Sequence, residues 1–372
     1  MQPKITEVLT DDNVLNFRLS GVNVSLANSI RRTIINDIPI TVFITEKYIE
    51  NKCEIQINTS RFHNEVVKQR LSCIPIITQN LDLLPDKYIL EVDIENDTEN
   101  IIYVTTEHFK IRNKANGNYM SQDEVQRIFP KNVITQSYID FIRLRPQIAD
   151  TISGERIKLT CDFSVATAKD NSMYNVVSKC AYFNTLDTVR AEEEWKKRED
   201  QYIKQNVLTP EEIKYEKKNF SILDAQRYFV ENSFDFVIES IGIYENKFIV
   251  KNACQILQNK MVDFVKNLDS DIVPIHISDT SMENAFDIVL ENEDYTIGKV
   301  IEYIIYATYY DIEPTNPNKI LFCGFKKMHP HDTDSIIRLQ LKPEFDKTTV
   351  KQIVRDSCIT ANNIYKDIFN NF

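Results

Sequence analysis

The sequence predicts an α+β fold made of two related strand-and-helix halves, the first of which carries a large insert with a mixed sheet. Residues 13–30 and 284–301 align without gaps, and each begins with an alternating apolar run that leads into a helix-like stretch. Residues 234–243 and 334–343 form a second pair of strand-like segments. Alternation of this kind places the apolar side chains on one face of a strand. The repeat alone does not prove that the two halves are related, because two parts of any α+β chain can be aligned this loosely.

The first pair of segments predicts two short helices. Ser25 and Thr296 are expected to cap them, because a hydroxyl side chain before an apolar-periodic stretch favours the N-cap position. The first helix should end near Ile38, because Pro39 follows and the residue before a proline disfavours helical geometry.

The second pair predicts two long amphipathic helices. In each, apolar residues recur in steps of three and four, which aligns them in one stripe. The stripes are Val250, Ala253, Leu257, Met261, Phe264 and Leu268, and Val350, Ile353, Ala361, Ile364 and Ile368, with Ser357 as a polar interruption. Neither half could bury such a stripe alone, so the two helices are expected to pack together as an interface within the chain.

The insert lies between the first short helix and its returning strand. The predicted division is residues 1–47 plus 226–268 for the first half, 48–225 for the insert and 269–372 for the second half. Strand-like segments such as YILEVDI, IIYVTTEHFKI and RIKLTCDFSVATA give the insert its sheet. The charged stretch from 187 to 219 predicts a solvated helical excursion.

Composition excludes several functions. The net charge of -11 argues against a chain whose main task is to grip phosphate backbones. With only six glycines, neither a G-x-G-x-x-G string nor a P-loop is present. The seven cysteines are dispersed without a C-x-x-C pair, so neither a zinc site nor a disulfide framework is expected. No apolar run is long enough to cross a bilayer and the first residues do not resemble a secretory signal, which predicts an intracellular protein.

Three strings resemble one protein family. Residues 25–32 (SLANSIRR), followed by Pro39, resemble a helix of the alpha subunit of bacterial RNA polymerase, the archaeal D subunit and the third-largest subunit of eukaryotic RNA polymerase II. Residues 62–76 (FHNEVVKQRLSCIPI) resemble a later string of the same subunits. Residues 293–298 (EDYTIG) and 322–330 (FCGFKKMHP) are similar to the small partner, the archaeal L or eukaryotic eleventh subunit.

The resemblance implies a non-catalytic assembly subunit of a DNA-dependent RNA polymerase. The implied fold is α+β, with two alpha-like dimerisation domains fused into an intramolecular pseudo-heterodimer and a mixed α/β-sheet insert domain. It implies no cofactor and no metal, and as partners the two largest polymerase subunits and a small tenth- or twelfth-type subunit. Contact with DNA is expected only through the complex, and none with a membrane. Such a fusion is expected of a large DNA virus, in the host cytoplasm and the virion.

The same resemblance points to residues that would bind the other subunits. Arg31 and Arg32 are the first candidates, because guanidinium groups hold carboxylates and carbonyls with fixed geometry. Asn28, Glu65 and Arg70 are further candidates, since they stand within the matching strings. Without the resemblance, two solvated arginines would be the simpler interpretation.

The chain also departs from the family pattern. Thr167 and Tyr295 stand where histidine is usual, and the four-cysteine zinc loop of the eukaryotic subunit is missing. The segment 329–334 (HPHDTD) has metal-ligand residue types but is better explained as a turn between strands. His63 and Glu65 lack a nucleophile or orienting group nearby in sequence. Two alternatives stay open: an enzyme with a dispersed site in the insert, and a free-standing dimerisation or DNA-binding module.

Overall fold

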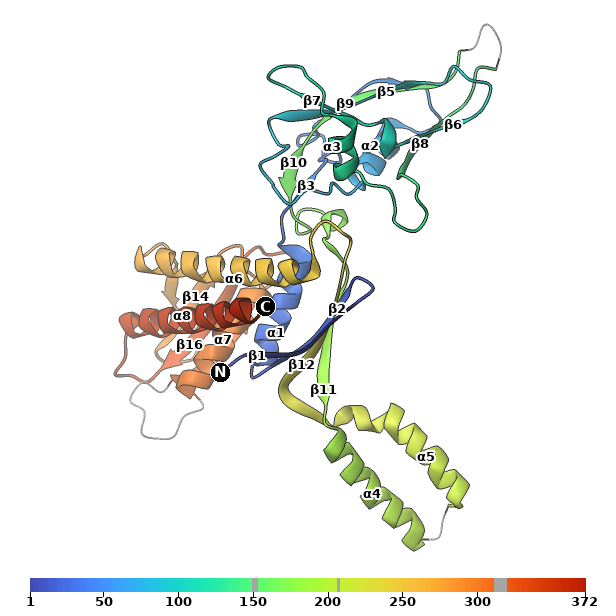
Figure 1. Ribbon diagram of the computed structural model, residues 1–372. Coiled ribbons are helices and arrows are strands. Elements are labelled where there is room, and N and C mark those ends of the chain that lie inside the picture. The colour runs from blue at the N-terminus through green and yellow to red at the C-terminus, as the bar shows by residue number, and fades with distance from the viewer. Residues whose placement is uncertain (149–152, 206–207, 311–319) are drawn as a thin grey trace. The chain divides into compact units, whose positions relative to one another are not determined.

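The computed structural model describes residues 1–148, 153–205, 208–310 and 320–372 (Figure 1). The chain forms two compact units. Unit 1 contains Met1–Ile34, Lys179–Glu239 and Asn246–Phe372, and unit 2 contains Ile35–Ser178 and Ser240–Glu245. The predicted halves therefore both lie mainly in unit 1, and residues 179–225, predicted as part of the insert, belong to unit 1 as well. Residues 206 and 207 of the predicted charged excursion lie outside the described residues.

The first sheet of unit 1 has the strand order β1-β2-β12-β11. Its strands are β1 (Lys4–Asp11), β2 (Val14–Ser20), β12 (Phe229–Ser240) and β11 (Val177–Leu186). Alternate residues of β2 are buried, as the sequence predicted. Phe17 on β2 lies directly opposite Phe236 on β12, and the two rings stack with centroids 4.9 Å apart.

The second sheet of unit 1 repeats this order with β13-β14-β16-β15. Its strands are β13 (Ile275–Ile277), β14 (Ala285–Leu290), β16 (Ser335–Leu341) and β15 (Ile320–Lys326). In both sheets a first hairpin leads into a short helix, and a later pair of strands leads into a long helix. In both, an arginine and an aspartate pair across the central strands, Arg18 with Asp235 at 2.7 Å and Arg338 with Asp287 at 2.6 Å.

The short helices are α1 (Val24–Asn36) and α7 (Tyr295–Ile305). The prediction that Ser25 and Thr296 cap them is wrong by two residues. The amide of Ser25 donates to Asn23 Oδ1 and that of Thr296 donates to Asp294 Oδ1, both at 2.9 Å. A carboxamide or carboxylate reaches the amide two residues ahead, so Asn23 and Asp294 take the capping positions. Helix α1 ends within two residues of the predicted end.

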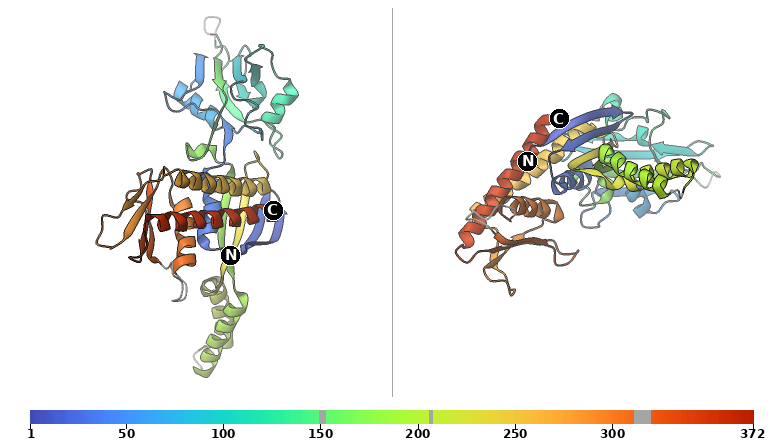
Figure 2. Two further views of the ribbon diagram at one scale, coloured as in Figure 1. Left: turned by 90° about the vertical axis from the view of Figure 1, so that its left-hand side faces the viewer. Right: turned by 90° about the horizontal axis from the view of Figure 1, so that it is seen from below.

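The long helices α6 (Asn246–Asp269) and α8 (Lys347–Asn371) lie side by side and antiparallel (Figures 1 and 2). Lys251 lies 5.6 Å from the ring centroid of Phe369, and Arg355 pairs with Asp269 at 3.0 Å, so opposite ends meet. All predicted stripe residues are buried, with at most 4% of their surface exposed, except the half-buried Phe264. Ser357 is buried too, and its hydroxyl donates to the carbonyl of Ile353 at 2.8 Å.

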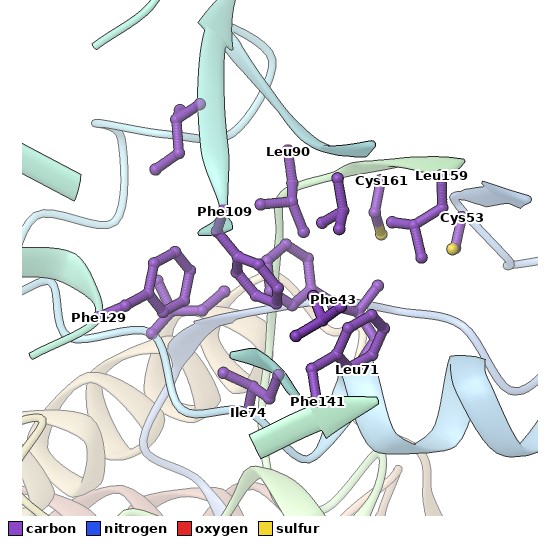
Figure 3. Packing of buried hydrophobic residues seen from close by; sticks show 14 of the residues in the cluster. Phe43, Cys53, Leu71, Ile74, Leu90, Phe109, Phe129, Phe141, Leu159 and Cys161 are labelled. Atoms are coloured by element: carbon purple, nitrogen blue, oxygen red, sulfur yellow. The ribbon is translucent and has the colours of Figure 1, made fainter. Parts of the chain in front are cut away.

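Unit 2 contains the predicted sheet, but its strand pairs are all antiparallel, so the prediction of a mixed sheet is wrong for the described residues. The strand order of this sheet is β4 (Cys53–Asn58), β9 (Arg156–Asp162), β5 (Tyr88–Glu95) and β7 (Lys110–Asn113). Two further sheets have two strands each. One pairs β6 (Ile102–Thr105) with β8 (Asp140–Leu144), and the other pairs β3 (Ile40–Val42) with β10 (Ser164–Ala166). Helices α2 (Asn64–Ser72) and α3 (Gln122–Ile128) complete it. The core is rich in phenylalanine, and Phe109 meets Phe129 and Phe141 edge to face (Figure 3). Of the strand-like segments predicted in the insert, YILEVDI is confirmed as β5, and RIKLTCDFSVATA contains β9 and β10. IIYVTTEHFKI is divided between β6 and β7 by a short 3-10 turn.

The charged excursion is a pair of helices between β11 and β12, as predicted. They are α4 (Thr188–Gln205) and α5 (Pro210–Ile222). Thr209 caps α5 in a reciprocal arrangement with Glu212. Trp195 and Phe220 form a small core of their own, with ring centroids 5.5 Å apart.

The contact between α6 and α8 can be tested at Leu257, which is fully buried in the α6 stripe. Replacement by alanine (Leu257→Ala) should lower the free energy of unfolding by ~3 kcal/mol, because buried methyl groups are lost and a cavity remains. Urea unfolding of the full chain, followed by circular dichroism, measures this. Val262→Ala on the same helix is the matched control, since Val262 is 41% exposed. Equal losses for the two variants would contradict the burial of this stripe against α8.

Candidate protein interface

An open groove of about 530 Å³ lies where α1 and α7 approach each other in unit 1. Its lining includes Asn28, Ser29 and Arg32 from α1 and Tyr295, Lys299, Glu302 and Tyr303 from α7. Asn28 and Lys299 occupy matching positions of the sequence repeat. The groove is therefore built from equivalent helices of the two halves, and it contains two of the predicted interface residues.

Arg32 is engaged within the chain. Its guanidinium pairs with Asp294 at 2.7 Å and also donates to the hydroxyl of Thr296 at 2.9 Å. Arg32 thus joins α1 to the capping turn of α7. Burial by itself would raise the pKa of Asp294, but hydrogen bonds from Thr296 and the charge and hydrogen bond of Arg32 outweigh it and lower that pKa. Solvent still reaches about a third of each side chain, 27% for Arg32 and 36% for Asp294.

Arg31 is held differently. It is half-buried, and its Nε donates to Asn28 Oδ1 at 3.0 Å, one helical turn away. Among the residues that the structure describes, no carboxylate forms an ion pair with it. The guanidinium is therefore oriented by a neutral side chain and keeps its charge available to an acceptor outside the chain.

A buried hydrogen bond also joins α1 to α8. The hydroxyls of Ser29 and Tyr365 lie 2.6 Å apart, and Ser29 Oγ lies 2.7 Å from the carbonyl of Leu26. If Ser29 donates its one proton to that carbonyl, Tyr365 is the donor to Ser29. Complete burial raises the pKa of Tyr365, so its proton is retained. Sequence reasoning missed this contact, because Tyr365 stands beside the predicted stripe and Ser29 is 336 residues away in the chain.

A further ion pair links α6 to the loop before α7. Lys260 lies 3.2 Å from Glu293, and both side chains are largely buried. Glu293 and Asp294 belong to the string that resembles the small partner subunit, and each receives a cation from the first half. The sequence marked this string by resemblance but did not indicate which residues it would meet.

The candidates in unit 2 have separate roles. Arg70 donates to the backbone carbonyls of Phe141 and Asp140 at 2.6 and 2.8 Å, which holds α2 against β8. Glu65 is exposed in the first turn of α2. Asn28, Arg31 and Arg32 lie in unit 1 whereas Glu65 and Arg70 lie in unit 2, so the five do not form one cluster within either unit.

The positions that depart from the family pattern are satisfied locally. Thr167 donates through its amide and its hydroxyl to Asp170, at 2.9 and 3.0 Å. The half-exposed ring of Tyr295 packs edge to face on Phe325, with centroids 5.1 Å apart.

The segment 329–334 is a turn between β15 and β16, as predicted. In the described parts of the chain, no three histidine, cysteine, aspartate or glutamate side chains converge as metal ligands would. Nor does any described helix have the length and apolar content needed to span a membrane.

Comparison with known proteins places these observations in one family. The sequence profile of the RNA polymerase Rpb3/Rpb11 dimerisation domain matches residues 16–261. The chain is 24% identical over 279 residues to DNA-directed RNA polymerase subunit Rpo3 of Pyrococcus furiosus, covering 69% of this chain and 94% of that protein. It is 23% identical over 270 residues to DNA-directed RNA polymerase II subunit RPB3 of Schizosaccharomyces pombe, covering 70% and 85%. The profile match begins in β2 and ends in α6, before the second half.

The pair of Arg32 and Asp294 can be tested by a double-mutant cycle with Arg32→Ala, Asp294→Ala and both changes together. A coupling energy of about 1 kcal/mol is expected at pH 7, since the pair is partly screened by solvent. Because Asp294 has a lowered pKa in the folded state, this stabilisation is present above its usual value of 3.8 and is lost as the pH falls through the folded pKa. Urea unfolding of the four proteins at neutral pH and at about pH 3 measures it. A coupling that is absent at neutral pH, or unchanged in acid, would contradict the pairing.

Proposed function

The chain belongs to the RNA polymerase Rpb3/Rpb11 dimerisation-domain family, and from this we propose that it is a non-catalytic assembly subunit of a DNA-dependent RNA polymerase. We further propose that its two halves are an Rpb3-like and an Rpb11-like part joined in one chain. The observation that carries this second step is the repeated strand order of the two sheets, β1-β2-β12-β11 and β13-β14-β16-β15, with the long helices α6 and α8 packed together.

Internal pairing is supported by how the two halves bury their surfaces. The stripes of α6 and α8 supply apolar burial, which is the main source of stability for an obligate interface. Arg32 with Asp294, Lys260 with Glu293 and Tyr365 with Ser29 add polar contacts between the halves, all at one end of α7 or along α8. Since the profile match ends in α6, the second half is assigned by its sheet order and its resemblance to the small partner subunit.

We propose that the groove on α1 and α7 docks a large catalytic subunit. Arg31 does not line the groove itself but is hydrogen-bonded to Asn28, which does. It is the cation best placed to bind the partner, because Arg32 is occupied by Asp294 and Lys299 by Glu302. Arginine is enriched among residues that dominate binding energy at protein interfaces. Tyr295 and Tyr306 line the groove and are exposed, and tyrosine is enriched at protein interfaces, so they could bind the same partner. Nucleotide addition would be carried out by the large subunits, and a tenth- or twelfth-type subunit would be a further partner. The viral source and the virion location stay predictions.

Charge reversal at Arg31 tests the docking site. Arg31→Glu should weaken capture of the second-largest polymerase subunit at least tenfold, because an arginine that dominates an interface contributes about 2 kcal/mol or more and the new carboxylate repels its acceptor. Affinity is measured by titrating the purified full chain against that subunit. Lys196→Glu is the matched control, since it makes the same charge change on the exposed face of α4.

Thermal unfolding should be the same for both variants, which separates loss of docking from loss of fold. If Arg31→Glu binds as tightly as Lys196→Glu, the docking surface lies elsewhere. The purified chain should also be inert with nucleotides and should show no strongly salt-dependent binding to DNA. Turnover of nucleotide would favour the enzyme alternative, and steep salt dependence would favour a DNA-binding module.

A further inference from the structure

Two cysteines face each other in the sheet of unit 2. Cys53 is the first residue of β4 and lies directly opposite Cys161 on β9 in the antiparallel register. Both are free thiols, with 2% and 0% of their surface exposed. Figure 3 shows both sulfur atoms on the core side of the sheet. No other two cysteines among the described residues occupy directly opposed strand positions.

We propose that Cys53 and Cys161 are a redox-active pair, which hydrogen peroxide converts to a disulfide that ties β4 to β9. The proposal rests on the register of the sheet and is independent of the function proposed above. Directly opposed residues of antiparallel strands have Cβ atoms about 4.5–5.5 Å apart, whereas a disulfide needs about 3.5–4.5 Å. A shift of about 1 Å therefore suffices to form the bond.

The position of β4 allows that shift. It is an edge strand, because the strand order is β4-β9-β5-β7. Its pairing with β9 is also interrupted by a bulge between Ile55 and Ile57. An edge strand with a bulge has a neighbour on one side only and is held by fewer ladder hydrogen bonds. It can move toward β9, and it can open to let a small oxidant reach the thiols.

The surroundings favour Cys53 as the attacking thiol. The hydrogen bond from Cys161 lowers the pKa of Cys53, burial opposes this, and the charge of Lys68 lowers it further. The same hydrogen bond, together with burial, raises the pKa of Cys161. A thiolate is the reactive form in peroxide reduction, and the partner thiol then resolves the product.

The reaction balances without another reactant. The thiolate of Cys53 attacks one oxygen of hydrogen peroxide, the O–O bond breaks, and a sulfenic acid and hydroxide form. The sulfur of Cys161 then displaces hydroxide from the sulfenic sulfur as the S–S bond forms. The two thiol protons leave in water. The net change is oxidation of two thiols to one disulfide and reduction of one peroxide to two water molecules.

A groove of about 540 Å³ in unit 2 offers a path toward the pair. Asn51 and Lys68 are among its lining residues. The side chain of Asn51 accepts from the amide of Cys53 at 3.1 Å and donates to its carbonyl at 3.0 Å. The groove thus reaches the residue that holds the start of β4.

The disulfide would fix the base of an exposed loop. Tyr48 and Ile49, in the loop between β3 and β4, are 96% and 95% exposed. That loop enters β4 at Cys53, so the bond would anchor its end to the centre of the sheet. Because the closed loop between the two cysteines is long, the bond should also stabilise unit 2 against unfolding.

Peptide mapping of the native full chain tests the proposal. The chain is treated with hydrogen peroxide, its remaining thiols are blocked, and it is digested with trypsin without reduction. The expected product is residues 53–61 linked to residues 159–169, and a reducing agent should abolish it. The oxidised chain should also show the unfolding midpoint of unit 2 raised by about 5–10 °C.

Variants separate this pair from general thiol oxidation. Cys53→Ala and Cys161→Ala should each abolish both the linked peptide and the rise in midpoint. Cys73→Ala, which removes an exposed thiol, should keep both. Mapping of the unaltered chain does not depend on the folding of any variant. If peroxide fully oxidises Cys73 while residues 53–61 and 159–169 stay unlinked, or if either links to a different cysteine, the proposal is overturned.

Discussion

The antiparallel packing of α6 against α8 is the interaction on which the rest of unit 1 depends. Each helix carries an apolar stripe, and the stripes are buried while the two helices contact each other along their length. Hydrophobic burial of this extent is not directional, so it brings the halves together without fixing their register. The stripes therefore explain why one chain can contain two sheets of the same strand order that act as a single compact unit.

Polar contacts supply the register. Arg32 reaches the capping residue of α7, Lys260 reaches the residue before it, and Tyr365 places a buried hydroxyl against Ser29. The hydroxyls of Ser29 and Tyr365 are fully buried and would be costly if unpaired, so this contact in particular disfavours any other alignment of the halves. In the same arrangement, the guanidinium of Arg31 is oriented by Asn28, which lines the groove. One of two adjacent arginines is thus paired within the chain, and the other has no ion pair among the described residues.

The sequence predicted the parts of the fold that depend on periodicity. The buried alternation of β2 and the stripes of α6 and α8 follow directly from apolar spacing, and Ser357 fits because its hydroxyl bonds within its own helix. The predicted N-caps, Ser25 and Thr296, were wrong because Asn23 and Asp294 stand two residues earlier and accept from their amides. Contacts between residues far apart in the chain could not be predicted from the sequence. Three features depend on how distant segments align in space, which cannot be inferred from one sequence. They are the different partners of Arg31 and Arg32, the hydrogen bond between Tyr365 and Ser29, and the opposed positions of Cys53 and Cys161.

The central claim is that the two halves are held together by their packed faces and not only by the chain that joins them. A protease site placed in the connection between α6 and β13, residues 270–274, allows that connection to be cut in the folded protein. Size-exclusion chromatography of the cut protein is the most direct measurement. The two fragments should elute together at the position of the intact chain and separate only in denaturant. Separation under native conditions would contradict the internal pairing.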